Sequence, residues 1–263
     1  MSRHPHRAHG CATPHAVLTK IAAALAGTLL LATAHAEPTS IDFESVTNVV
    51  TPALAAGDTA YNTDDAFRQA GFTLQVRNNA TAAPDDYGLV GALVDGADPF
   101  GCYITACPTG NASTWFAGLN DGALDLSRDD HLAFTVDGLQ FAFIGPVGGL
   151  PNLAFGQLAL TGTLAGGGTV TVRNDFPGQG SAGSFRFDQF LLGGFGANAL
   201  TRLRIDACLY DANGGCSFDH LTTQNQAQFA IDNVQLSLVP EPAALTMLMV
   251  GLAALALTAR RRA

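Results

Sequence analysis

The chain has 263 residues, of which 48% are hydrophobic and only 13% are charged. This composition excludes an intrinsically disordered chain, which would carry fewer apolar and more charged residues. Between residues 37 and 239 there are seven arginines and 21 acidic residues, and this net charge of −14 repels phosphate backbones, so the composition also excludes nucleic-acid binding.

Residues 1–36 are predicted to be a signal peptide. Arg3, Arg7 and Lys20 precede a run without charge over residues 21–34, and Ala-His-Ala at 34–36 places small residues where signal peptidase reads the chain. We therefore expect export and cleavage after residue 36. Because Lys20 is the only lysine, the exported chain would have none for Schiff-base chemistry or a phosphate loop.

Residues 37–239 are predicted to form one extracytoplasmic all-β domain, a two-layer β-sandwich of jelly-roll type. Short apolar or alternating runs recur between clusters of glycine, aspartate and asparagine, as expected for strands joined by turns. A sheet of so many strands must close or stack into two layers. The candidate strands are residues 40–46, 72–76, 89–94, 114–117, 132–136, 139–144, 157–164, 169–173, 184–192, 203–209 and 228–238.

Two turns and one helical turn complete the predicted secondary structure. Asp137-Gly138 and the Ala-Gly-Gly-Gly run at 165–168 are predicted to be hairpin turns, because glycine readily adopts the backbone conformation that such turns need. Residues 64–70 are predicted to form a helical turn.

Four cysteines lie in the body and form two close pairs. Cys102 and Cys107 enclose four residues, and Cys208 and Cys216 enclose seven. Four cysteines allow three connectivities, and proximity in an oxidising periplasm favours a disulfide within each pair. The alternative is a zinc site. The spacing argues against it, because zinc ligands usually form tighter Cys-x2-Cys pairs.

The body shows no nucleophile motif, and we expect that it is not an enzyme. Residues 178–183 match the dinucleotide string G-x-G-x-x-G, but they lead into an alternating strand rather than a helix, so a plain loop is predicted. His131 and His220 are expected to be exposed loop residues. Acid pairs such as Asp64-Asp65 leave a hydrolase open, since a glycosidase needs two carboxylates across a cleft.

No organic cofactor is predicted, and structural calcium is the one inorganic candidate. Calcium binds oxygen ligands, which this acidic body supplies in number. Asp211 begins a loop that looks like a calcium loop, but Thr222 stands where the final glutamate belongs. We therefore predict Glu44 and Asp232 as calcium ligands, where the first and last strands are expected to meet.

Two aromatic residues are candidates for stacking on sugar rings. Trp115 is the only tryptophan, and Tyr103 lies inside the small cysteine loop, where its ring would be displayed rigidly. Packing in the core is the alternative for Trp115.

The last 24 residues combine a proline-flanked glutamate, an apolar run and a terminal arginine cluster. They comprise Pro240, Glu241 and Pro242, the uncharged residues 243–259, and Arg260, Arg261 and Arg262. The apolar run makes a helix of about 25 Å, enough to cross a thin bilayer, and the arginines would mark its cytoplasmic end. An ordinary membrane anchor is the alternative to a specific signal.

This tail resembles the PEP-CTERM sorting signal of Gram-negative bacteria that make exopolysaccharide. The resemblance implies that an exosortase, a membrane cysteine peptidase, cleaves near residues 240–242. The prolines suit this role because they keep the junction extended. The precursor would be tethered to the inner membrane, and the body would then pass to the cell surface or extracellular matrix.

The first and last runs of the body carry a second resemblance. Residues 41–44 (Ile-Asp-Phe-Glu) and 229–234 (Phe-Ala-Ile-Asp-Asn-Val) are similar to the opening and closing strands of body domains joined to this tail and of carbohydrate-binding jelly rolls. The resemblance implies that these strands pair side by side.

The predicted function is that of an exported surface or matrix protein with a structural or adhesive role in the biofilm. The first alternative is a carbohydrate-binding module for the exopolysaccharide, and the second is a secreted hydrolase.

Overall fold

The computed structural model describes residues 37–78, 89–98, 107–145, 154–180, 183–216 and 227–239, together with Gly251. The predicted signal peptide and nearly all of the predicted sorting tail lie outside these ranges, so both stay predictions, as do the domain boundaries. Within the described ranges, no helix is long and apolar enough to cross a membrane.

Fourteen strands and one short 3-10 helix, η2 (Gly193–Ala197), organise the described residues. The all-β class predicted from the sequence is therefore confirmed. The strands are β1 (Glu37–Ile41), β2 (Thr47–Asn48), β3 (Ala60–Asn62), β4 (Ala66–Gln69), β5 (Phe72–Asn78), β6 (Leu89–Asp95), β7 (Thr114–Gly118), β8 (Gly122–Arg128), β9 (Phe134–Phe143), β10 (Gly156–Leu164), β11 (Thr169–Asp175), β12 (Asp188–Gln189), β13 (Leu200–Leu209) and β14 (Phe229–Leu238).

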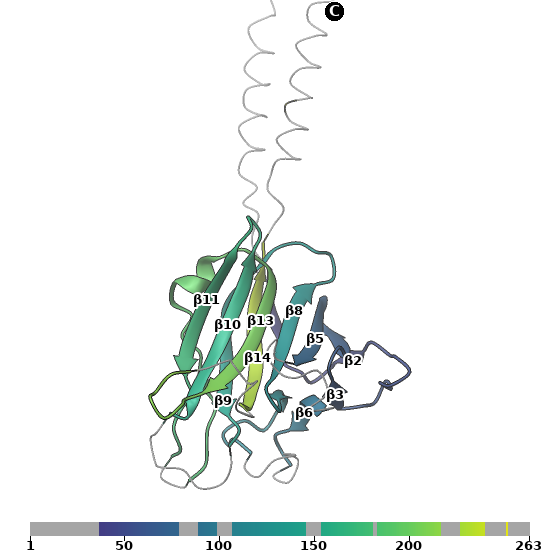
Figure 1. The fold of residues 1–263 in the computed structure, drawn as a ribbon. Coiled ribbons are helices and arrows are strands. Elements are labelled where there is room, and N and C mark those ends of the chain that lie inside the picture. The colour runs from purple at the N-terminus through teal and green to yellow at the C-terminus, as the bar shows by residue number, and fades with distance from the viewer. Residues whose placement is uncertain are drawn as a thin grey trace, which may run out of the picture. The chain divides into compact units, whose positions relative to one another are not determined.

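The strands lie in two antiparallel layers (Figure 1). The first layer has the order β2-β4-β5-β8-β13-β10-β11, and the second has β12-β9-β14, with β1 and β7 sharing the far edge of β14 and β6 and β3 beyond β7. The register pair of Leu200 with Phe134 joins β13 to β9 and so links the two layers. This curled arrangement agrees with the predicted sandwich, whereas the jelly-roll type stays a prediction.

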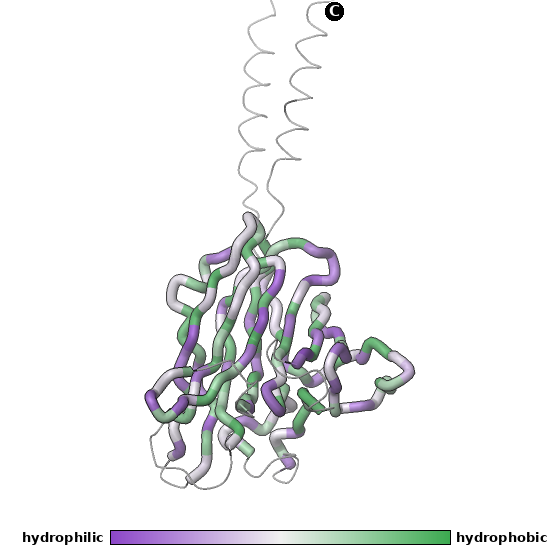
Figure 2. The backbone as a smooth tube through the Cα atoms, in the orientation of Figure 1, coloured by the Kyte–Doolittle hydropathy of each residue, from purple (hydrophilic) through white to green (hydrophobic). Residues whose placement is uncertain are grey.

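Phenylalanines fill the space between the layers. Phe67 of β4 lies 6.1 Å from Phe116 of β7 between ring centroids, and Phe72 of β5 lies 5.3 Å from Phe134 of β9. All four side chains are buried. Figure 2 shows hydrophobic and hydrophilic residues alternating along the strands, which is the pattern that buries one side of each layer.

β14 is the central strand of the second layer. β1 pairs with one edge of it over the whole length of β1, β7 continues along the same edge, and β9 pairs with the opposite edge. The expected pairing of the first and last strands is therefore confirmed.

The predicted turn at residues 165–168 is confirmed. The Leu164 N–H donates to the Gly168 carbonyl over 3.0 Å, closing the hairpin between β10 and β11. Gly167 and Gly168 have φ angles of +91° and +85°, which residues with a side chain rarely adopt.

The predicted turn at Asp137-Gly138 is wrong, because β9 runs through it from Phe134 to Phe143. The register against β14 shifts here, so Asp137 is an extra residue in a β-bulge. The bulge lets Val136 and Leu139, three positions apart, both point into the core.

The predicted helical turn at residues 64–70 is also wrong. This segment contains β4, whose Phe67 is fully buried and whose four residues all pair with β5. Tertiary packing of one phenylalanine therefore overrides the weak local preference.

Candidate functional site

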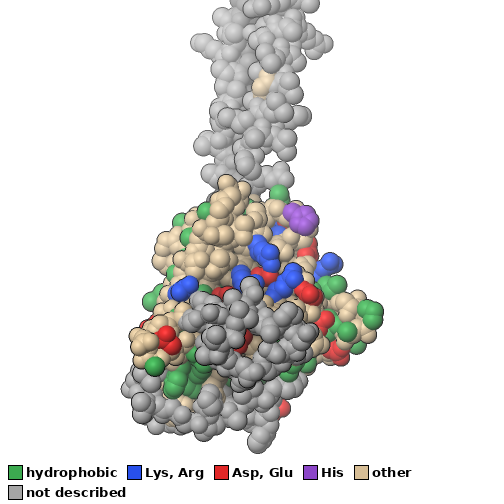
Figure 3. Space-filling view, in the orientation of Figure 1, with side chains coloured by type: hydrophobic (Ala, Val, Ile, Leu, Met, Phe, Trp, Pro, Cys, Tyr) green, Lys and Arg blue, Asp and Glu red, His purple; other side chains and the backbone are tan. Residues whose placement is uncertain are grey.

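The outward-pointing side chains of the first layer form a polar face, which we call the arginine face. On β13, Leu203 and Ile205 point into the core, while Arg202 and Arg204 point outward. The same alternation sends Arg77 of β5 and Arg173 of β11 to this side, and Arg68 of β4 reaches Thr73 of the neighbouring strand. Five of the seven body arginines therefore share one face, and Figure 3 shows several blue side chains together with red ones on the side of the body that is turned to the viewer.

Strand register arranges this face in straight rows. One row crosses five strands and consists of Gln75, Asp125, Arg204, Thr161 and Thr171. Neighbouring strands are about 4.8 Å apart, so the row is about 19 Å long. Every member carries a hydrogen-bonding side chain, and all except the buried Asp125 are at least partly exposed, which makes the row suitable for an extended polar ligand.

Asp125 lies at the centre of the face, among three guanidinium groups. Its Oδ2 makes ion pairs with Arg202 Nη2 and, at 3.4 Å, with Arg77 Nε, and its Oδ1 lies 3.9 Å from Arg204 Nη1. The Asp125 side chain is 5% exposed, whereas the Arg202 side chain is 48% exposed. A single shielded carboxylate therefore pairs with three guanidiniums, of which Arg202 is the most exposed.

Two further aspartates partly balance the arginines. Asp64 pairs with Arg77 Nη1, and Asp206 Oδ2 lies 3.3 Å from Arg204 Nε. Burial raises the pKa of Asp206 above its usual value, and the positive charges of Arg204 and Arg173 oppose this effect.

Not every polar atom of this cluster finds a hydrogen-bond partner. Arg77 Nε, Arg204 Nη2 and Asp125 Oδ1 are buried atoms without a hydrogen bond in the part of the chain that the structure describes. Two of them make ion pairs at longer distance, Arg77 Nε with Asp125 Oδ2 at 3.4 Å and Asp125 Oδ1 with Arg204 Nη1 at 3.9 Å, which are less directional than hydrogen bonds.

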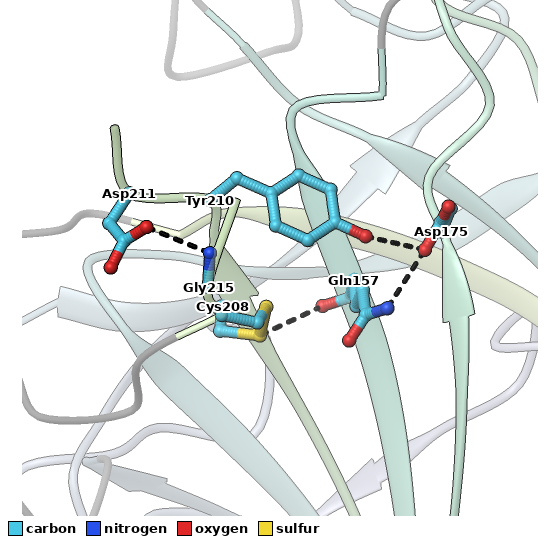
Figure 4. The surroundings of a disulfide bond; sticks show 7 residues. Gln157, Asp175, Cys208, Tyr210, Asp211 and Gly215 are labelled. Carbon is cyan, nitrogen blue, oxygen red and sulfur yellow. Dashed lines mark hydrogen bonds between the residues drawn. A yellow bond between two sulfur atoms is a disulfide. The ribbon is translucent and has the colours of Figure 1, made fainter. Parts of the chain in front are cut away.

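A tyrosine and two polar residues extend the face at the far ends of β10 and β11 (Figure 4). The Tyr210 hydroxyl donates to Asp175 Oδ1 over 2.5 Å, and Gln157 Nε2 donates to the same oxygen over 2.8 Å. These two bonds lower the pKa of Asp175. Burial and the bond to Asp175 raise the pKa of Tyr210 to about 12, so Tyr210 is a neutral donor at physiological pH.

The predicted disulfide between Cys208 and Cys216 is confirmed, with the two Cα atoms 5.5 Å apart. It fixes the loop that carries Tyr210 and Asp211 beside Gln157. Cys107 is also disulfide-bonded, but Cys102 lies outside the described residues, so that pairing stays a prediction.

The two predicted calcium ligands, Glu44 and Asp232, both contact the segment at the start of β7. Glu44 accepts hydrogen bonds from the Thr114 N–H and hydroxyl, at 2.7 and 3.1 Å. Asp232 Oδ2 accepts from Ser113 Oγ over 2.7 Å and from Asn111 Nδ2 over 2.6 Å. Protein donors therefore already contact both carboxylates.

Asp232 is fully buried, and its hydrogen bonds come from neutral donors. Burial raises its pKa, while the hydrogen bonds from Asn111, Ser113 and Asn233 lower it. The negative charge of Asp42 lies close enough to raise this pKa as well. Within the described ranges, no group of three or more His, Cys, Asp or Glu side chains is placed to hold a metal ion. Calcium binding stays a prediction, which a calcium titration of the melting temperature would test.

Trp115 lies in a second apolar cluster on the outward side of the second layer. It is 1% exposed and packs edge-on against Phe187 at 5.8 Å between ring centroids, with Ala117, Ile144 and Ala230 around it. A buried ring offers no face to a sugar in solution, so Trp115 takes the core role that the sequence allowed as the alternative. Tyr103 and His220 lie outside the described residues, and His131 is exposed as expected.

Two open pockets flank the layers. A pocket of about 460 Å³ lies beside Glu44 and is lined by Phe43, Thr59, Asp95 and Thr114. One of about 480 Å³ lies at an end of the arginine face and is lined by Arg68, Thr73, Ser127, Arg128, Asp129 and His131. The second pocket continues the polar character of the face.

The sequence missed the centre of the arginine face. Strand β8, which supplies Asp125, was not predicted, so the meeting of this carboxylate with three arginines could not be foreseen. The available signal was the charged alternation of Arg202, Arg204 and Asp206 between apolar residues of β13.

No family model matches this chain, and no curated protein sequence matches it. Three solved structures resemble the fold loosely. TmCBM61 in complex with β-1,4-galactotriose is 9% identical, with a TM-score of 0.32 over 63% of this chain and 88% of its own. The enzymatically active domain of tailspike protein 4 of bacteriophage CBA120 is 12% identical, with a TM-score of 0.27 over 65% of this chain and 20% of its own.

The third structure comprises the CBM22-1–GH10 modules of Clostridium thermocellum endo-1,4-β-D-xylanase 10B with xylohexaose. It is 10% identical, with a TM-score of 0.29 over 74% of this chain and 29% of its own. At these TM-scores the three likenesses assign neither a family nor a ligand to this chain.

Proposed function

We propose that this chain is an exported surface protein whose β-sandwich body binds polysaccharide through the arginine face. The observation that carries the proposal is the row of hydrogen-bonding side chains across five strands, from Gln75 to Thr171. Hydroxyl, amide and guanidinium groups are the partners that sugar hydroxyls need, and a row that crosses five strands suits an extended chain. Tyr210, partly exposed at one end, adds an aromatic ring with a fixed hydroxyl.

The second part of the proposal is delivery to the cell surface. The signal peptide would direct export, and an exosortase-type peptidase would release the inner-membrane-tethered precursor near Pro240-Glu241-Pro242. A bound polysaccharide would then hold the released body in the extracellular matrix. A structural or adhesive role follows from binding alone, without catalysis.

Retention on immobilised polysaccharides tests the binding. The full chain, purified in mild detergent, is passed over neutral and acidic polysaccharides, and we expect retention on at least one of them. Retention on none would overturn the proposal. Release of reducing ends during the same incubation would instead support the hydrolase alternative.

Replacing Pro240, Glu241 and Pro242 by alanines tests the sorting. Three alanines would continue the helix and hide the cleavage strand, so the unprocessed precursor should stay in the inner-membrane fraction. Normal processing and release of this variant would overturn the sorting proposal and leave the binding proposal in place.

A further inference from the structure

We infer that the ligand of the arginine face is an acidic polysaccharide, a sugar chain that bears carboxylates. This inference rests on the proposed polysaccharide binding and names its ligand class. It begins from the uneven distribution of charge: the body carries a net −14, yet five of its seven arginines lie on one face.

The centre of this face has no net negative charge, unlike the rest of the body. Arg77, Arg173, Arg202 and Arg204 lie there with Asp64, Asp125, Asp206 and Asp175, so four positive charges balance four negative ones. The rest of the body is acidic, but at physiological ionic strength charges more than about 8 Å away are largely screened. A bound polyanion would therefore respond mainly to the nearby guanidinium groups.

The chemistry of arginine favours carboxylates. A guanidinium offers five N–H donors in a rigid fork that matches the two oxygens of a carboxylate. Asp125 has only two oxygens for three guanidiniums, and Arg202 remains 48% exposed after its ion pair is made. The exposed part of the Arg202 guanidinium therefore keeps N–H donors at the place where a ligand carboxylate would arrive.

The spacing of the arginines suits a repeating anion. Arg202 and Arg204 are two residues apart on β13, which is about 6.7 Å along a strand, and Arg173 lies two strands away on the same side. Threonines 161, 163, 169 and 171 lie between and beside them and can bind sugar hydroxyls. Cations alternating with neutral donors match a chain in which carboxylates alternate with hydroxyls.

The test compares polygalacturonate, an acidic polysaccharide, with the neutral polysaccharide dextran and with double-stranded DNA. The full chain is measured by affinity electrophoresis, alone and as the variants Arg202→Gln and Arg173→Gln. Arg186→Gln is the matched control, because it removes the same charge from an exposed arginine outside the arginine face. Unfolding curves check that each variant is folded.

We expect tight binding of polygalacturonate and weak binding of dextran and DNA. Loss of one charge-assisted contact should weaken polygalacturonate binding about tenfold in Arg202→Gln, and also in Arg173→Gln, while Arg186→Gln stays within twofold of the unchanged chain. Added salt should weaken binding of the unchanged chain more than binding of Arg202→Gln.

Equal binding of dextran, with no effect of either arginine variant, would overturn this inference and leave the proposed function standing. Equal binding of DNA would overturn it as well, since the face would then accept any polyanion. Binding of no polysaccharide at all would overturn the proposed function together with the inference.

Discussion

The outward sides of the two layers arise from the same alternation of side chains along the strands, but one side is apolar and buried and the other is polar and charged. On the second layer, Trp115, Ala142 and Ile144 point outward and are buried under the segment that carries Phe187. On the first layer, the equivalent positions carry Arg202, Arg204 and other polar side chains. The contrast shows that a sheet face covered by its own chain becomes a second core, while the other face keeps the charges.

Buried carboxylates on the two sides show the same contrast. Asp125 on the arginine face makes ion pairs with three guanidiniums, whereas Asp232 on the covered side accepts hydrogen bonds from neutral amide, hydroxyl and backbone donors. The ion pairs of Asp125 leave N–H donors of the exposed Arg202 for a ligand. The hydrogen bonds to Asp232 use the donors around it and stabilise the fold. We therefore expect mutations on the covered side to affect stability, and mutations on the arginine face to affect binding.

Trp115→Ala should have the largest effect. Removing a fully buried indole leaves a cavity and should lower the free energy of unfolding by about 4 kcal/mol, measured by urea denaturation. Leu191→Ala is the control, since Leu191 is 73% exposed and should change stability by less than about 0.5 kcal/mol. If Trp115→Ala kept its stability but lost polysaccharide binding, the covered side would be the glycan site and the comparison would be reversed.

Asp232→Ala should follow in size. Asn111, Ser113 and Asn233 would lose the acceptor that they share, which should lower the free energy of unfolding by about 3 kcal/mol. Gln235→Ala, three residues away on the same strand and exposed, should be close to neutral. If Asp232→Ala lowered the free energy of unfolding as little as Gln235→Ala, the hydrogen bonds to Asp232 would not contribute to stability.

Asp125→Asn should separate stability from binding. The amide keeps the shape but removes the charge that holds three arginines together, so the free energy of unfolding should fall by about 2 kcal/mol at low salt and recover in high salt. The freed guanidiniums should bind polygalacturonate more tightly than in the unchanged chain. Weaker binding would show that Asp125 positions the arginines rather than competing with the ligand.

Tyr210→Phe should have the smallest effect, about 1 kcal/mol, because one partly exposed hydrogen bond is lost. The pKa of Asp175 is lowered in the folded chain, so its contribution to stability is present above its unfolded pKa and is lost as the pH falls through its folded pKa. Removing the hydroxyl should raise the pKa of Asp175, followed by carboxylate NMR, and flatten the acid side of the stability profile. An unchanged pKa would assign the shift to Gln157 alone.

Strong local patterns made much of the fold predictable. The alternation at residues 72–76, 157–164 and 169–173 predicted strands that the structure contains as β5, β10 and β11. The glycines at 166–168 predicted the hairpin between β10 and β11. Gly167 and Gly168 have positive φ angles there, which few residues other than glycine adopt. The close spacing of Cys208 and Cys216 predicted a disulfide that the structure contains.

The failures come from interactions between distant segments. Strand β8 carries the sequence Gly-Ala-Leu-Asp-Leu-Ser-Arg, which alone looks like a polar loop, and pairing with β5 and β13 makes it a central strand. Residues 184–192 alternate like a strand, yet they contain only the two-residue strand β12, because Phe185 and Phe187 pack against different clusters. No local pattern states that Asp125 meets arginines from two neighbouring strands.

The central position of β14 also governs when the domain can fold. β1, β7 and β9 each pair along one edge with this last strand, and about 190 residues separate β1 from it. At about 5–20 residues per second, a growing chain needs roughly 10–40 s to supply β14 after β1 has appeared. During that interval three strand edges stay unpaired and prone to aggregation. This delay favours binding of a chaperone that keeps the chain unfolded until β14 is available.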